Sequence, residues 1–79
     1  MVRYRIESKL SPEKVLEQAV AFFSGGLGLE ITQQEPCCVQ FVGGGGYVSV
    51  SIVEGKKTLV DLETREWDYQ VRQFMHRIG

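Results

Sequence analysis

The chain has 79 residues, of which 43% are hydrophobic, and its 9 basic and 10 acidic side chains leave a formal net charge of -1. This length fits one domain, placed at residues 1–79, and the apolar content excludes an intrinsically disordered chain. The charge balance provides no general attraction to nucleic acid or to anionic lipid. The apolar runs are too short to span a membrane and the amino terminus lacks a signal pattern, so we expect a cytoplasmic location.

The amino-terminal third predicts a strand followed by a helix. Apolar and charged residues alternate over residues 2–7, as in a strand with one buried face. Ser11 and Pro12 indicate a helix start, because serine caps helices and proline is favoured at their first position. The apolar residues that follow form an arc wide enough for deep burial, and the helix is predicted to run to Ser24 and end at the next two glycines.

Alternating segments in the middle of the chain predict a four-strand meander. Its strands are residues 29–34, 38–42, 47–53 and 57–65, with a turn at 54–56 before the last. The run from Gly43 to Gly46 between two alternating stretches is typical of a hairpin. It does not fit a phosphate-binding loop, which leads into a helix. Four glycines exceed the need of a tight turn, so the tip is expected to be mobile or closely approached.

The last segment predicts an amphipathic helix. Acidic residues lie near its start and basic residues near its end, as the helix dipole favours. Its apolar stripe recurs at helical spacing and consists of Trp67, Val71, Phe74, Met75 and Ile78.

These elements predict an α+β fold in the order β-α-β-β-β-β-α. Topology rules give a five-stranded antiparallel sheet of order 2-3-4-5-1 with both helices on one face. This topology resembles half of a TATA-binding-protein-like saddle, or a reduced helix-grip domain of the polyketide cyclase and START type; the resemblance covers the whole chain and includes no family motif. The residues predicted to point into the core are Tyr4, Ile6, Leu29, Ile31, Val39, Phe41, Val48, Val50, Ile52, Val60 and Leu62.

Cys37 and Cys38 are adjacent in the sequence. Neighbouring Cα atoms are about 3.8 Å apart, short of the usual disulfide range of about 4.4–6.8 Å. We therefore expect two free thiols and neither a structural disulfide nor a metal. The alternative is a vicinal redox switch or a soft-metal site, although the sequence contains no CxxC motif. His76 lies opposite the apolar stripe on the helical wheel and is expected at the surface.

Asp61 and Glu63 are predicted on one strand face about 7 Å apart, a spacing that suits an acid/base pair. Lys57 and Arg65 share that face, so we interpret the four residues as a charge ladder. No Ser-His-Asp or Cys-His set can be assembled from the sequence. We therefore predict no catalytic residue, no cofactor and no enzymatic activity.

The sheet face that carries no helix, called the helix-free face below, remains as a candidate surface. Its predicted residues are Arg3, Arg5, Glu7, Glu30, Thr32, Gln34, Cys38, Gln40, Val42, Tyr47, Ser49, Ser51, Val53, Leu59, Asp61, Glu63 and Arg65. We predict a small non-catalytic interaction or assembly module that forms a homodimer through this face or through an exposed strand edge. The predicted binding residues are Cys38, Val42, Tyr47, Val53 and Leu59.

Two alternatives stay open. The helix-grip resemblance implies a small hydrophobic-ligand-binding protein, with a pocket between the last helix and the sheet lined by Trp67, Val71, Phe74 and Met75. The α-β-β-β-α core also invites comparison with double-stranded-RNA-binding domains. Those domains carry lysines where this chain has Glu66 and Asp68, so nucleic-acid binding ranks third.

Overall fold

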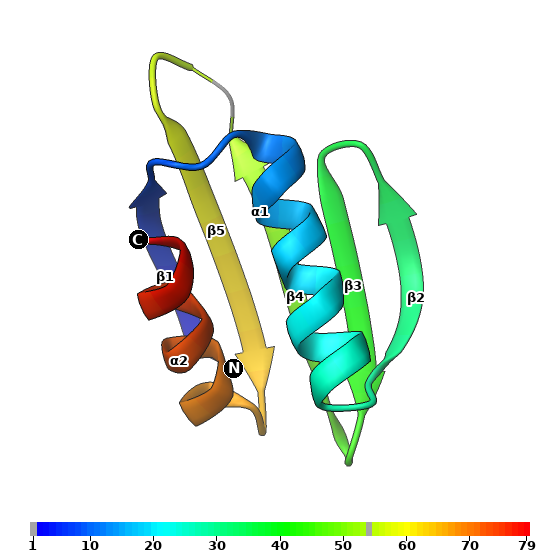
Figure 1. Cartoon of the computed structure of the whole chain (residues 1–79). Helices are drawn as coiled ribbons and strands as arrows, with labels where there is room; N and C mark the ends of the chain where they lie inside the picture. The colour runs from blue at the N-terminus through cyan, green and yellow to red at the C-terminus, as the bar shows by residue number, and fades with distance from the viewer. Residues whose placement is uncertain (1, 54) are drawn as a thin grey trace.

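The computed structural model describes residues 2–53 and 55–79, and it contains one five-stranded sheet. Figure 1 shows the helices packed against one face of this sheet. Glu54, in the predicted turn at 54–56, lies outside the described residues. In chain order the elements are β1 (Val2–Ser8), α1 (Pro12–Ala19), η1 (Val20–Gly26), β2 (Glu30–Glu35), β3 (Cys38–Gly43), β4 (Gly46–Val53), β5 (Thr58–Arg65) and α2 (Asp68–Ile78). The predicted α+β class and element order are confirmed.

The sheet is antiparallel throughout and has the order β1-β5-β4-β3-β2. This is the predicted order 2-3-4-5-1 read from the opposite edge. The helical segment between β1 and β2 carries the chain across the sheet, so the first two strands in sequence become its two edges. Of the four neighbouring strand pairs, three are hairpins between consecutive strands and the fourth is the pairing of β1 with β5.

The first helix starts as predicted and then changes its winding. Ser11 Oγ accepts a hydrogen bond of 3.3 Å from the backbone nitrogen of Lys14, and a proline follows at the first helical position. The single α-helix expected up to Ser24 is wrong, because the chain continues from α1 as the π-helix η1. A π-helix has more residues in each turn. Neighbouring Phe22 and Phe23 both contact the ring of Phe74, at centroid distances of 5.7 and 5.2 Å.

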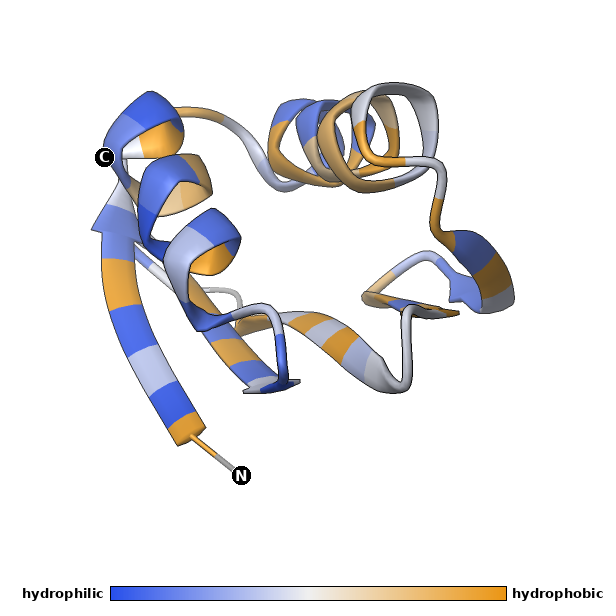
Figure 2. Cartoon of the chain, turned by 90° about the horizontal axis from the view of Figure 1, so that it is seen from below, coloured by the Kyte–Doolittle hydropathy of each residue, from blue (hydrophilic) through white to orange (hydrophobic). Residues whose placement is uncertain are grey.

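The core lies between the sheet and the helices. Figure 2 shows the hydrophobic stripes of the helices turned toward the sheet. Every residue predicted to point inward belongs to this core or packs against it, with Tyr4, Ile6 and Ile31 partly exposed at the edges. The buried Ser8 donates a hydrogen bond to the carbonyl of Ile78, which joins the end of β1 to the end of α2.

The glycine hairpin is closely approached by its surroundings. Gly43 and Gly46 extend β3 and β4 and pair with each other, which leaves Gly44 and Gly45 as a two-residue turn with φ of 59° and 80°. Such a turn needs positive φ at both positions. Gly46 has a different requirement, because a Cβ there would overlap the carbonyl oxygen of Arg65.

Strand β2 contains a β-bulge that the sequence did not reveal. Ile31 pairs with Phe41, and the next paired residue is Gln33 opposite Gln40, so Thr32 is the extra residue. The bulge reverses the alternation beyond it. Gln34 pairs with Val39 and therefore lies on the helix side of the sheet, which corrects the prediction for Gln34 on the helix-free face. Gln33 and Glu35 take that face instead.

Candidate functional site

The helix-free face is organised in four rows that cross the strands. The pairing register fixes these rows. In order along the strands they are Glu30, Val42, Tyr47 and Arg65; Gln33, Gln40, Ser49, Glu63 and Arg3; Glu35, Cys38, Ser51, Asp61 and Arg5; and Val53, Leu59 and Glu7. The structure thus brings the five predicted binding residues onto one face, in the first, third and fourth rows.

Two apolar pairs lie at opposite ends of this face. Val42 is next to Tyr47 in the first row, and Val53 is next to Leu59 in the fourth. Val42 and Val53 are 40% and 41% exposed, while their two neighbours are half-buried. The centre of the face between the pairs carries the small hydroxyl side chains of Ser49 and Ser51 on β4.

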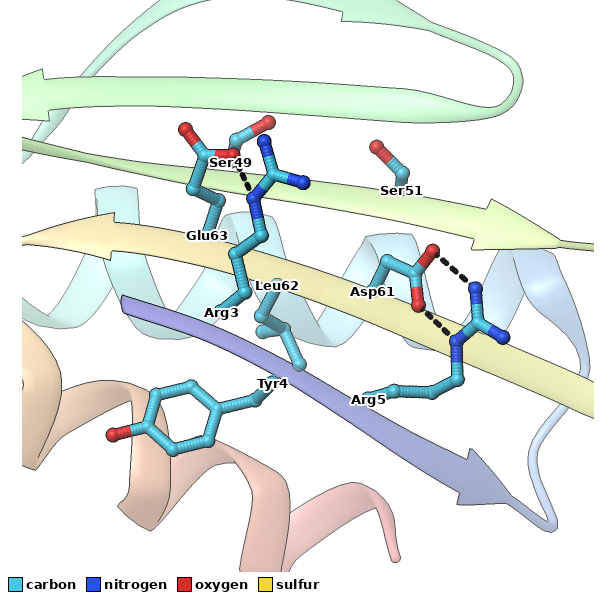
Figure 3. Close-up of a pocket in the computed structure, with 8 residues that line it drawn as sticks. All are labelled: Arg3, Tyr4, Arg5, Ser49, Ser51, Asp61, Leu62 and Glu63. Atoms are coloured by element: carbon cyan, nitrogen blue, oxygen red, sulfur yellow. Dashed lines mark hydrogen bonds and ion pairs between the residues drawn. The ribbon is translucent and has the colours of Figure 1, made fainter. Parts of the chain in front are cut away.

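Charged residues of β1 and β5 form a ladder beside this centre (Figure 3). Arg5 donates two hydrogen bonds to Asp61, of 2.6 and 2.9 Å, and Arg3 lies 2.9 Å from Glu63. The ladder differs from the predicted one of Asp61 and Glu63 with Lys57 and Arg65, because both carboxylates pair with arginines of β1. Lys57 instead lies 3.4 Å from Glu7. Together with the two serines, the two arginines of β1 and their carboxylate partners line an open depression of about 470 Å³.

The hydrogen bonds of the ladder shift the acidities of its members. The bonds from Arg5 lower the pKa of Asp61. Tyr47 donates a bond of 2.6 Å to Glu63, and this bond, followed by the charge of Arg3, lowers the pKa of Glu63. The same bond raises the pKa of Tyr47. Both carboxylates are therefore held ionised at neutral pH.

The two edges of the helix-free face differ in charge. The β1 edge presents Arg3 and Arg5, whose side chains remain 77% and 61% exposed despite their ion pairs. The β2 edge presents Glu30 and Glu35, both exposed. The face is thus basic along most of the β1 edge, which ends at Glu7, and acidic along the β2 edge.

The residues of the alternative ligand pocket lie on the opposite side of the sheet. Val71 and Phe74 are fully buried in the core, whereas Trp67 and Met75 are half-buried and pack against it. A separate hollow of about 290 Å³ lies beside Met75 and is also lined by Tyr4, Ile6, Arg72 and His76. His76 is exposed, as the helical wheel predicts.

The expectation of two free thiols is wrong, because Cys37 and Cys38 are joined by a disulfide. Their Cα atoms are 3.8 Å apart, as adjacency requires. Cys37 lies in the turn after β2, and its carbonyl accepts a hydrogen bond of 2.9 Å from Ile52 N, whereas Cys38 already belongs to the β3 ladder. This change of backbone direction brings the two sulfur atoms together, and the direction of the side chains was not evident from the sequence.

Glu35 is a site residue that the sequence reasoning missed. One of its carboxylate oxygens and the two Sγ atoms of Cys37 and Cys38 all lie within 4.8 Å of one another. Gln33 Nε2 donates a hydrogen bond of 2.9 Å to Oε1 of Glu35. A regular β2 would have placed Glu35 on the other face, and only the bulge brings it beside Cys38.

Comparisons with known proteins give information on the fold. No helix of the described residues is long and apolar enough to cross a membrane. No protein-family model and no curated protein matches the chain. Among solved structures, the chain is similar to the solution structure of the Aha1 dimer from Colwellia psychrerythraea, with a TM-score of 0.62 and 16% identity over 99% of this chain and 96% of that one. At this identity, the likeness shows that the two chains share a fold.

Proposed function

We propose that this chain is a small non-catalytic interaction module that forms a homodimer through its helix-free face. The observation that carries the proposal is the exposure of Val42 and Val53 on a sheet face over which no other described element packs. An antiparallel sheet with one covered face normally keeps polar residues on the other. Apolar residues gathered on such a face, with a polar surround, are typical of a contact surface.

The structure favours the face over the strand edges as the place of contact. The bulge at Ile31 and Gln33 interrupts the hydrogen-bonding pattern of β2. Bulges and charged side chains both oppose edge-to-edge pairing. The other edge, β1, carries charged Arg3, Arg5 and Glu7 at alternate positions. Neither edge therefore offers a regular, uncharged strand to a second chain.

The charge distribution selects one two-fold arrangement of the dimer. An axis parallel to β4 lays the basic β1 edge of one copy over the acidic β2 edge of the other, so that Arg5 lies opposite Glu35. An axis across the strands instead lays Arg3 over Arg5 and Asp61 over Glu63, which opposes like charges. The first arrangement also stacks the two β4 strands, where Ser49 and Ser51 leave room for sheets about 10 Å apart.

Two further considerations support a homodimer. A standard interface covers about 800 Å² of each partner, which is a minor part of the total accessible surface of 4904 Å² of this chain. The similar solved structure is described as a dimer of that protein. The likeness in fold makes a dimer of this chain a natural first hypothesis.

Light scattering coupled to size exclusion at micromolar concentration tests the proposal. The wild type is expected at about twice 8.9 kDa. Val53→Glu places a carboxylate at the stacked β4 strands and is expected to give the monomer. Tyr69→Glu is the matched control, because Tyr69 is 61% exposed on α2, away from the helix-free face, and its substitution leaves the dimer intact. A monomeric wild type at high concentration would contradict the proposal. If a native mass spectrum then shows that this monomer retains a small molecule, the ligand-binding alternative is favoured.

A further inference from the structure

The turn between β2 and β3 gathers sulfur and carboxylate ligands at the surface. Cys37 and Glu35 are exposed and Cys38 is half-buried. The three ligand atoms lie within 4.8 Å of one another, and no ion pair of Glu35 occurs among the described residues. Among the described residues, the only side-chain hydrogen-bond partner of this carboxylate is the amide of Gln33.

We propose that this turn is a redox-gated site for a thiophilic divalent cation such as zinc, with Cys37, Cys38 and Glu35 as its ligands. In the oxidised chain the two sulfur atoms are bonded to each other and the cation is excluded. In the reduced chain the two thiolates and the carboxylate provide three ligands, and water completes the coordination. Glu35 and Cys38 also lie on the helix-free face, so the site is tested in a monomeric variant as well as in the wild type.

Stability does not account for this disulfide. A disulfide stabilises a fold mainly by closing a loop and so restricting the unfolded chain. The bond between Cys37 and Cys38 joins adjacent residues and closes no intervening segment. The fold is held by the sheet and the core, and the turn itself is tied to β4 by the hydrogen bond from Ile52 N to the carbonyl of Cys37. The chemistry of the pair is therefore the better explanation of its presence at an exposed turn.

The ligand set fits a zinc-like cation. Thiolate sulfur prefers zinc and softer metals, and glutamate oxygen is a common additional zinc ligand. Zn–S distances of about 2.3 Å place two thiolates roughly 3.8 Å apart in tetrahedral geometry. The sulfur atoms thus need only to separate after reduction, while the carboxylate is already within reach. The hydrogen bond from Gln33 orients the carboxylate, in the way that outer-shell partners orient metal ligands.

The redox step balances by thiol–disulfide exchange with a dithiol reductant. A thiolate of the reductant attacks one sulfur and the Cys37–Cys38 bond breaks, which leaves a mixed disulfide. The second reductant thiol then attacks the reductant's sulfur in this bond, so the remaining cysteine leaves as a thiol and the reductant forms its own disulfide. Two electrons and two protons pass to the chain, which then holds two thiols. Binding of the cation displaces both thiol protons, so the affinity rises with pH until the thiols are ionised.

Titration with Co²⁺ as a spectroscopic substitute for zinc tests the proposal. The oxidised protein is expected to show no free thiol and no thiolate-to-cobalt absorption in the near ultraviolet. After reduction with a phosphine and its removal without oxygen, the protein should show two thiols, one bound cobalt ion and this absorption band. Zinc should then displace cobalt. The titration is repeated in Val53→Glu, so that the result does not depend on the oligomeric state.

Three variants, one of them a control, assign the ligands. Replacement of both cysteines by serine should abolish the band, with the fold checked by circular dichroism. Glu35→Gln keeps both thiols and should weaken cobalt binding by about 10-fold or more. Glu30→Gln removes the same charge from the same strand at its far end and should leave the affinity unchanged. The proposal is overturned if the reduced wild type gives no thiolate band, if the oxidised protein binds equally well, or if Glu35→Gln binds as tightly as wild type.

Discussion

The indole Nε1 of Trp67 donates a hydrogen bond of 2.9 Å to the carbonyl oxygen of Gly43, which joins the start of α2 to the tip of the β3–β4 hairpin. The ring also covers Gly44, where a Cβ would come within 2.7 Å of Trp67 Cζ2. The run of glycines therefore has two separate causes. The turn itself needs positive φ at Gly44 and Gly45, and close approach by neighbours needs the missing side chains at Gly44 and Gly46.

Trp67→Ala is expected to lower the free energy of unfolding by about 2–4 kcal/mol, because the half-buried ring leaves both the core edge and the hairpin tip. Trp67→Phe keeps most of the ring contact and removes the hydrogen bond to Gly43, so its expected cost is about 1 kcal/mol. Urea unfolding of the three proteins measures both values. Equal losses for the two variants would show that the hydrogen bond, rather than the packing of the ring, holds α2 to the hairpin.

Gly46→Ala is expected to cost about 3 kcal/mol, because the new Cβ overlaps a backbone carbonyl and forces the hairpin to move. Gly25→Ala is the control. Gly25 lies in η1 with no atom within 4 Å of an added Cβ and needs no positive φ. This variant should be unchanged or gain about 0.5–1 kcal/mol. Similar losses in both variants would mean that close approach at Gly46 is not the cause.

Much of the sheet could be predicted because its central strands alternate strictly. In β4, Val48, Val50 and Ile52 are buried, and the residues between them face the helix-free side. A register shift of one residue would expose this whole set, so the pattern fixes the pairing. The same reasoning placed the five candidate binding residues on one face. The arginine partners of Asp61 and Glu63 could not be read in this way, since they depend on the register of β1 against β5, which the predicted strand order leaves open.

The β2 edge could not be predicted for the opposite reason. Beyond Ile31 its residues are all polar, so either register leaves polar groups exposed and the pattern contains no signal for a bulge. The position of Glu35 beside Cys38 depends on that bulge. The disulfide was missed because adjacency fixes the distance between the Cα atoms and leaves the direction of the two side chains open.

The stability of the fold at acidic pH should depend on the ion pair of Arg5 and Asp61. Because the hydrogen bonds from Arg5 lower the pKa of Asp61, the folded state favours the carboxylate. The resulting stabilisation is present above the unfolded pKa of about 3.9 and is lost as the pH falls through the lower folded value. Arg5→Gln should therefore raise the pKa of Asp61, measured by carboxyl NMR titration, and reduce the loss of stability below about pH 4.

Lys14→Gln is the control for this titration, because it removes an equal charge from α1, far from the sheet face. Its side chain is 4.0 Å from Glu17 and exposed, so the acidity of Asp61 should stay that of the wild type. If both variants shift Asp61 alike, the cause is the general charge of the protein and not the two hydrogen bonds from Arg5.

The two-fold axis along β4 predicts that position 53 of one copy lies close to position 53 of the other. Val53→Glu and Val53→Lys should each be monomeric, because the dimer would place like charges together at the stacked strands. An equimolar mixture should form a heterodimer, since the two substitutions then pair as opposite charges. With one variant isotopically labelled, native mass spectrometry distinguishes the heterodimer from either homodimer by mass.

The same two substitutions at Val42 provide the control for the axis. Val42 is as exposed as Val53, at 40% against 41%, but it lies on β3, one strand away from the axis. There it faces Arg65 of the other copy, so residue 42 of one copy does not meet residue 42 of the other. The mixture should therefore show no preference for the heterodimer. A preference at position 42 and none at position 53 would place the axis at Val42 on β3 instead of along β4. A wild-type dimer that neither set of variants disturbs would move the interface to another surface, because two charges at either end of the helix-free face cannot both be tolerated within it.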